Sequence, residues 1–123
     1  MKDEFIICGD CKSVLHKLPG TVSNAKSGMN ILEAGVTDGA KEKHIPVVKV
    51  EGNNVTVKVG SMAHPMTQEH YILWIMLRTD KGFMYRILEP NQEAVACFTL
   101  QENEKPLTVY EMCNIHGLWK TEL

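Results

Sequence analysis

Residues 45–59 read IPVVKVEGNNVTVKV, and this stretch decides the fold class. In residues 55–59 every second position is valine and the two positions between are polar, which is the period of a half-buried β-strand. The Gly-Asn-Asn sequence at 52–54 is a turn signal between that strand and residues 45–51. The stretch therefore predicts two antiparallel strands joined as a hairpin.

Further short strands are predicted on the C-terminal side of this hairpin. Residues 71–79 are apolar on both faces, which favours a central strand covered on both sides, although a short buried helix has the same pattern. Other segments of β character are 83–88, 94–100 and 107–112. Short strands at spacings of roughly ten residues, with turn signals between them, are typical of an antiparallel β-sandwich. We therefore predict an all-β fold.

The composition changes near residue 40. Residues 1–40 contain scattered glycines, serines and asparagines and no long periodic segment. This pattern predicts a small, loop-rich N-terminal lobe. The lobe should have little core of its own, because a chain of about forty residues seldom builds a sufficient core alone. We expect two parts, residues 1–40 and residues 41–123.

The overall composition gives no indication of a nucleic-acid or membrane partner. The 123 residues carry a formal net charge of −2, so bulk charge does not favour either kind of partner. No segment is apolar enough to span a membrane, and the apolar run at residues 5–7 is too short for the core of a signal peptide. We expect a cytoplasmic protein.

The cysteines and histidines are the residues most able to carry chemistry. The four cysteines stand at positions 8, 11, 97 and 113. In a reducing compartment such an uneven set favours metal binding or catalysis over a disulfide framework. Cys97 lies inside a predicted strand and is expected in the core. The five histidines stand at positions 16, 44, 64, 70 and 116.

Four short segments each place a potential metal ligand at the end of a predicted strand or in a turn. They are EKHIP (42–46), HPM (64–66), EHY (69–71) and CNIHG (113–117). Cys113 and His116 are three residues apart, so a tight turn can bring both side chains to one metal. A histidine or cysteine taken alone is more often a hydrogen-bonding or packing residue. The residues by themselves therefore support only a metal-site hypothesis.

The spacing of these segments resembles a known family. The patterns EKHIP at 42–46, GSxxHPMxxxHY at 60–71 and CNxHGxW at 113–119 resemble the signature of the desulfoferrodoxin and neelaredoxin family of superoxide reductases. The resemblance covers essentially all of residues 41–123 and implies an immunoglobulin-like sandwich. It also implies one mononuclear non-haem iron, Fe²⁺/Fe³⁺, with four equatorial histidines and an axial cysteine thiolate. The implied ligands are His44, His64, His70, His116 and Cys113.

The activity implied by the resemblance is the one-electron reduction of superoxide to hydrogen peroxide. Five protein donors are too many for a tetrahedral structural zinc site, whereas imidazoles suit iron. One thiolate adds electron density along its axis, and a sixth position stays open opposite it. The net positive charge of such a site attracts the superoxide anion. The electron is expected from a small donor such as a rubredoxin, and a homodimer is implied by the resemblance.

Glu42 and Lys43 are the candidate catalytic residues beside the iron. In the family the lysine lies beside the open position, where it is thought to draw in superoxide and help deliver a proton through water. The glutamate can occupy the sixth position once the iron is oxidised. Without the resemblance, two charges on a loop indicate only a solvated surface.

His116 is expected to bind the metal through Nδ1 and the other three histidines through Nε2. His116 is only three residues from Cys113, so it has little room, and Nδ1 lies nearer the backbone. The family also has this pattern.

Two functions compete with the reductase. One is a non-catalytic iron-binding electron-transfer module on the same fold. The presence of Glu42, Lys43 and all five implied ligands argues against it. The other is a superoxide dismutase that needs no external donor.

The N-terminal lobe departs from the fuller pattern of the family. Two-iron members carry a small rubredoxin-like domain in which two cysteine pairs hold a second iron. Here Cys8-Gly9-Asp10-Cys11 resembles the first pair, whereas Asn24 and Ala25 stand where the second pair is expected. Two thiolates cannot make a four-sulfur iron site. We therefore predict a degenerate desulforedoxin-like lobe without iron, although His16 could join Cys8 and Cys11 as a third ligand.

Overall fold

The computed structural model describes residues 3–17, 30–37 and 44–123. The chain divides into two compact units, Met1–Glu33 and Ala34–Leu123. This division comes earlier than residue 40.

The described residues form ten strands and no helix: β1 Glu4–Ile7, β2 Val14–Lys17, β3 Asn30–Leu32, β4 Pro46–Glu51, β5 Asn54–Val59, β6 Ile72–Thr79, β7 Phe83–Ile87, β8 Val95–Thr99, β9 Pro106–Cys113 and β10 Gly117–Glu122. Within these ranges, then, no helix is long and apolar enough to cross a membrane.

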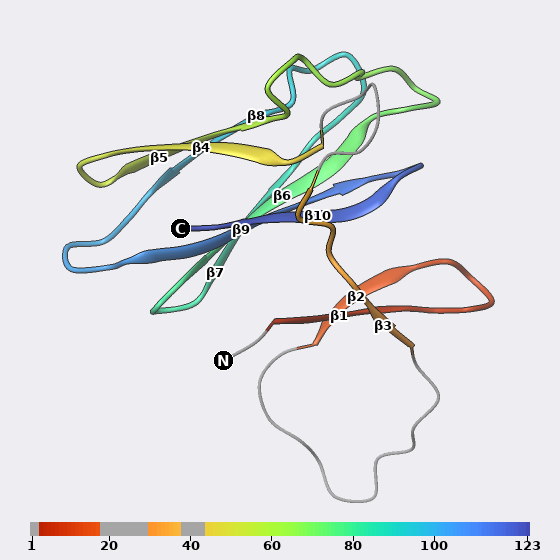
Figure 1. The fold of residues 1–123 in the computed structure, drawn as a ribbon, viewed down its shortest axis with the longest axis horizontal. Coiled ribbons are helices and arrows are strands. Elements are labelled where there is room, and N and C mark those ends of the chain that lie inside the picture. Colours follow the sequence, from red (N-terminus) through yellow and green to blue (C-terminus); the bar gives the residue numbers. More distant parts are fainter. Residues whose placement is uncertain (1–2, 18–29, 38–43) are drawn as a thin grey trace, which may run out of the picture. The chain divides into compact units, whose positions relative to one another are not determined.

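The second unit is an antiparallel β-sandwich of the immunoglobulin-like kind. One sheet has the strand order β10-β9-β6-β7 and the other has the order β4-β5-β8 (Figure 1). Strand β6 lies between β7 and β9, as its apolar faces predicted, and the alternative of a short buried helix is wrong. The predicted hairpin is also confirmed, because Pro46 pairs with Val59 and Glu51 with Asn54. The all-β expectation is therefore correct.

The core forms where the apolar faces of the two sheets meet. The three alternating valines of β5 are at most 2% exposed, and Ile75 and Leu77 of β6 are fully buried. Cys97 was expected in this core, and that expectation is wrong, because the side chain is exposed. The reason is the two-residue period of β8. Ala96 and Phe98 are the residues that face the core, so Cys97 points outward.

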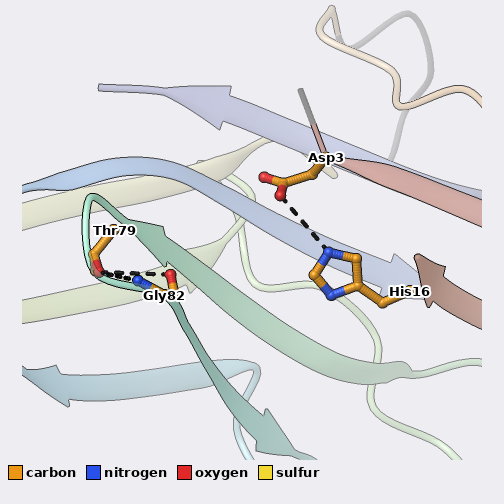
Figure 2. Close-up of polar contacts among 4 residues, drawn as sticks. All are labelled: Asp3, His16, Thr79 and Gly82. Carbon is orange, nitrogen blue, oxygen red and sulfur yellow. Dashed lines mark hydrogen bonds and ion pairs between the residues drawn. The ribbon is translucent and has the colours of Figure 1, made fainter. Parts of the chain in front are cut away.

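Buried Thr79 organises the turn between β6 and β7. Its Oγ1 accepts hydrogen bonds from the backbone N–H groups of Lys81 (3.1 Å) and Gly82 (3.2 Å). Figure 2 shows the contact between Thr79 and Gly82. The same hydroxyl donates to Oε2 of Glu104 at 2.5 Å. This bond is the largest reason why the pKa of Glu104 is lowered, since it favours the ionised carboxylate.

Strands β1, β2 and β3 of the first unit were not predicted. Strand β1 pairs with both others, in the order β2-β1-β3. Phe5 is only 1% exposed, and its ring stacks on that of His16, with centroids 4.6 Å apart. His16 Nε2 also lies 3.7 Å from an oxygen of Asp3 (Figure 2). The apolar run of β1 is only three residues long, too short to give a periodic signal in the sequence.

Candidate metal centre

Antiparallel pairing brings the ends of five strands together around the predicted ligands. His44 lies just before β4, and the start of β4 pairs with the end of β5, which is followed by His64. His70 lies just before β6, whose first residue pairs with Cys113 at the end of β9. His116 lies in the turn between β9 and β10. Each predicted ligand thus belongs to a strand end or a connection, as the sequence indicated.

The four imidazole rings form a closed cycle. The ring centroids of His44 and His64 are 4.8 Å apart, and those of His64 and His70 are also 4.8 Å apart. His70 and His116 are separated by 5.1 Å, and the cycle closes between His116 and His44 at 4.8 Å. Every neighbouring pair meets edge-on, with interplanar angles of 66–82°. The rings therefore surround one common point.

Cys113 adds a buried sulfur to this cycle. Its side chain is 2% exposed. The ligand atoms of Cys113, His44, His64 and His70 all lie within 4.8 Å of one another. Sγ of Cys113 lies 3.9 Å from Nδ1 of His116 and accepts a hydrogen bond from the backbone N–H of His116 at 3.4 Å. The turn that brings His116 to the cluster therefore also polarises the sulfur.

The hydrogen bonds indicate which ring nitrogens face inward. Nδ1 of His116 lies 3.0 Å from Nε2 of His44, so these two atoms face each other inside the cluster. Nδ1 of His64 lies 2.7 Å from the carbonyl oxygen of Pro65, where its N–H can donate and leave Nε2 as the ligand atom. Such a bond fixes both the tautomer and the orientation of a metal-binding histidine.

The cluster is deep on its sulfur side and open at His116. His44 and His64 are 2% and 5% exposed, and His70 is half-buried. His116 is exposed to solvent. The sulfur of Cys113 therefore stays away from water, whereas His116 meets it.

Asn114 holds the segment that carries His70. Its backbone N–H donates to the carbonyl of Tyr71 at 3.2 Å, and its Oδ1 accepts from the Tyr71 N–H at 3.0 Å. Its Nδ2 donates to the carbonyl of Glu69 at 3.0 Å. The residue next to Cys113 thus fixes the backbone on both sides of His70. The sequence reasoning gave Asn114 no role, although it stands inside the CNxHGxW pattern.

Trp119 supports two members of the cluster. Its indole ring stacks on His44, with centroids 4.8 Å apart and an angle of 14°. Its Nε1 donates to the carbonyl oxygen of His116 at 3.1 Å. Gly35 lies directly against this ring, because a Cβ on Gly35 would be 2.6 Å from Cε3 of Trp119. Strand β10, which carries Trp119, was not predicted, since its polar residues mask the two-residue period.

The donor set fits an iron ion. Nitrogen ligands bind first-row metals at about 2.1 Å, so two of them at right angles around one ion lie about 3 Å apart. The 3.0 Å between Nε2 of His44 and Nδ1 of His116 matches that spacing. Imidazoles together with a single thiolate suit iron, and five donors exceed the four of structural zinc.

The structure does not place three of the predicted residues in this cluster, for two different reasons. Glu42 and Lys43 lie outside the described residues, so their roles stay predictions. His16 lies against Phe5 and Asp3 in the first unit. Among the described residues, histidine, cysteine and acidic side chains come close enough to bind one metal around Cys113, and no such group contains His16.

Comparison with known proteins gives a consistent set of relatives. A model of the desulfoferrodoxin family matches residues 36–122. The desulfoferrodoxin of Syntrophotalea carbinolica is 41% identical over 116 residues, which are 94% of this chain and 90% of the relative. The superoxide reductase of Pyrococcus horikoshii is 36% identical, covering 70% of this chain and 90% of its own. The crystal structure of the superoxide reductase from Treponema pallidum superposes with a TM-score of 0.77 at 38% identity, covering 98% of both chains.

Proposed function

The chain belongs to the desulfoferrodoxin family, and from this premise we propose that it is a superoxide reductase. It reduces superoxide to hydrogen peroxide at one mononuclear non-haem iron, with an electron from an external donor. His44, His64, His70 and His116 are its nitrogen ligands, and Cys113 is its sulfur ligand. The observation that carries this proposal is the closed cycle of four imidazole rings with one buried sulfur beside it.

Each side chain of the site has a task that its position supports. Iron held there would supply the one-electron redox chemistry, and an external donor would restore the electron. Cys113 raises the electron density at the centre, and its burial keeps the thiolate away from solvent oxidants. The backbone N–H of His116 moderates that electron density through its hydrogen bond to the sulfur. A small anion would bind at the sixth position, opposite Cys113.

We propose that Glu42 and Lys43 are the catalytic residues beside the metal. They immediately precede His44, the first ligand in the chain. The ammonium of Lys43 would attract an anion and could pass a proton through water, and the carboxylate of Glu42 could bind the metal after oxidation. We propose further that a rubredoxin-type protein is the donor, that the chain forms a homodimer, and that it works in the cytoplasm.

The number of metals per chain and the visible spectrum test the site. We expect one iron per chain, and an oxidised-minus-reduced spectrum with a thiolate-to-ferric charge-transfer band. The double variant Cys8→Ser/Cys11→Ser should keep the same iron content, because the N-terminal lobe has only two of the four thiolates that a rubredoxin centre needs. A protein without the band, or with two irons per chain, would contradict the proposed site.

A further inference from the structure

Cys8 and Cys11 frame the turn between β1 and β2. The backbone N–H of Cys8 donates to the carbonyl of Ser13 at 2.9 Å, and the N–H of Lys12 donates to the carbonyl of Cys8 at 3.0 Å. Lys12 adopts a left-handed conformation, with φ of 62°, which reverses the chain. The turn is thus closed by hydrogen bonds at both ends, and it holds the two cysteines at fixed positions.

The turn brings the two cysteine side chains into contact. The backbone N–H of Cys11 donates to Sγ of Cys8 at 3.3 Å. The Cys8 thiol also hydrogen-bonds the Cys11 sulfur, as do the hydroxyl and the backbone N–H of Ser13. The sulfur of Cys11 is exposed, whereas Cys8 is partly buried. The Cys11 thiol therefore meets solvent, and the Cys8 thiol is less accessible.

These hydrogen bonds favour the ionised form of Cys11. The bond from the Cys8 thiol is the largest cause, the bonds from Ser13 follow, and together they lower the pKa of Cys11 to about 7. A thiol with this pKa is about half ionised at neutral pH, and the thiolate is the form that attacks peroxides.

We propose that Cys8 and Cys11 form a peroxide-reactive dithiol, in which Cys11 attacks hydrogen peroxide and Cys8 then closes an intramolecular disulfide. In the first step the Cys11 thiolate forms an S–O bond and the O–O bond breaks. The released hydroxide takes a proton and leaves as water. The sulfur is oxidised to sulfenic acid while the peroxide is reduced.

The second step uses the neighbouring thiol. Sγ of Cys8 attacks the sulfur of the sulfenic acid, an S–S bond forms, the S–O bond breaks, and a second water leaves with the Cys8 proton. One peroxide has then been consumed for two thiol hydrogens. A dithiol reductant restores the pair. The dithiol thus lowers the local level of the peroxide that the proposed iron reaction makes, although its own chemistry does not depend on that reaction.

Two features set this dithiol apart from a metal site. Residues 1–40 contain no cysteine besides Cys8 and Cys11, so a four-sulfur site is incomplete. The nearby histidine, His16, stacks on Phe5 and lies 3.7 Å from an oxygen of Asp3. Its ring is therefore engaged on the sheet of the first unit and is not held at the turn.

Peptide mapping after treatment with hydrogen peroxide tests the proposal on the full-length, iron-loaded protein. Trypsin cleavage after Lys2 and Lys12 places both cysteines in one peptide, residues 3–12. We expect this peptide to lose two hydrogens on treatment and to regain them with dithiothreitol. The rate of this oxidation should rise about tenfold from pH 6 to pH 8, because the thiolate fraction of a group with a pKa of about 7 rises by that factor. Because peroxide is added as a reagent, the result is independent of whether the iron site reduces superoxide.

Single variants separate the two thiols. Cys8→Ser should leave a sulfenic acid on Cys11 that dimedone traps, whereas Cys11→Ser should abolish rapid oxidation of the peptide. Ser13→Ala removes one hydrogen bond to the Cys11 sulfur. In this variant the rate of oxidation by peroxide should therefore reach half of its maximum at a higher pH than in the wild type. Exposed Cys97, on β8, is the internal control and should stay unmodified over the same time.

Three results would overturn the proposal. One is the absence of the disulfide after peroxide treatment. Another is oxidation of Cys97 as fast as that of Cys11, which would indicate that exposure alone decides the reaction. The third is a zinc or iron ion that is lost in the Cys8→Ser/Cys11→Ser variant, because metal-bound thiolates would not be available as a dithiol.

Discussion

At the scale of single residues, the site depends on atoms that only the folded chain brings together. The family pattern in the sequence pointed to four histidines and Cys113, and the structure brings these five side chains together. The sequence also predicted that His116 presents Nδ1, and in the structure this atom faces Nε2 of His44 at 3.0 Å. The part played by Trp119 was not foreseen, because its stack on His44 joins residues far apart in the sequence.

Replacing the sulfur ligand tests the most specific residue of the site. Cys113→Ser should abolish the charge-transfer band and lower the activity by at least about tenfold, which is the smallest loss typical even for an outer-shell partner of a metal ligand. The reason is that oxygen donates charge to iron less well than sulfur does. Visible spectra and superoxide decay kinetics measure both effects. Cys97→Ser, the same change at an exposed position, should alter neither the spectrum nor the activity. A Cys113→Ser protein that kept its colour and full activity would show that Cys113 is not a ligand.

The charge of Lys43 should act on the rate of encounter. Lys43→Ala should slow the bimolecular reaction with superoxide by about tenfold at low salt and weaken its dependence on ionic strength, while the iron stays bound. Pulse radiolysis at several salt concentrations measures both quantities. Lys49→Ala removes the same charge from the exposed face of β4, where the lysine pairs with Glu51 at 3.3 Å, and should have a much smaller effect. If the two variants changed the rate and its salt dependence equally, Lys43 would act only as one of the general surface charges.

At the scale of elements, strand alternation in the sequence located most of the sandwich. The strands that were missed are β1, β2, β3 and β10, whose short or polar segments give no clear period. Cys97 was misplaced because a cysteine carries no information about which face of β8 it occupies. The neighbours Ala96 and Phe98 decide that question through their burial.

The contact between Gly35 and β10 should control the affinity for iron. The N–H of Gly35 donates to the carbonyl of Leu118 at 2.9 Å, which seats Gly35 against the ring of Trp119. Gly35→Ala should displace that ring from His44 and weaken iron binding by about 10–100-fold, the usual cost of losing outer-shell support. Competition with a chelator measures the affinity. Gly9→Ala, at a glycine whose added Cβ would meet nothing within 4 Å, is the control; equal affinities in the two variants would contradict the role given to Trp119.

The β6–β7 turn should give a pH-dependent contribution to stability. Thr79→Val removes the hydroxyl that serves Lys81, Gly82 and Glu104, and should lower the free energy of unfolding by about 1–3 kcal/mol at neutral pH. The bond to Thr79 lowers the pKa of Glu104 below its usual 4.5, so the stabilisation is present above that pH and is lost as the pH falls through the folded-state pKa.

Urea unfolding at neutral pH and at a pH well below 4.5 measures this contribution. The difference between wild type and Thr79→Val should be larger at neutral pH than in acid. Thr56→Val, the same change on β5 in the other sheet, should leave the acid dependence unaltered. A difference that is independent of pH would mean that Glu104 takes no part.

At the scale of the whole molecule, two units have different chemistry. The sandwich gathers four histidines and Cys113 at the ends of its strands, whereas the N-terminal unit retains one cysteine pair on a hydrogen-bonded turn. The count of cysteines predicts an N-terminal lobe without iron, and this stays a prediction. The sequence did not predict the dithiol, because the proximity of Cys8, Cys11 and Ser13 comes from the shape of the turn.

The yield of hydrogen peroxide per superoxide consumed tests the central claim most directly. The iron-loaded protein would be supplied with a reduced rubredoxin-type donor and a measured amount of superoxide, with the Cys8→Ser/Cys11→Ser variant used so that the dithiol does not consume the product. A reductase takes its electron from the donor. We therefore predict that each superoxide consumed yields one hydrogen peroxide and removes one electron from the donor. One peroxide for every two superoxides, with the donor left reduced, would show a dismutase and contradict the account.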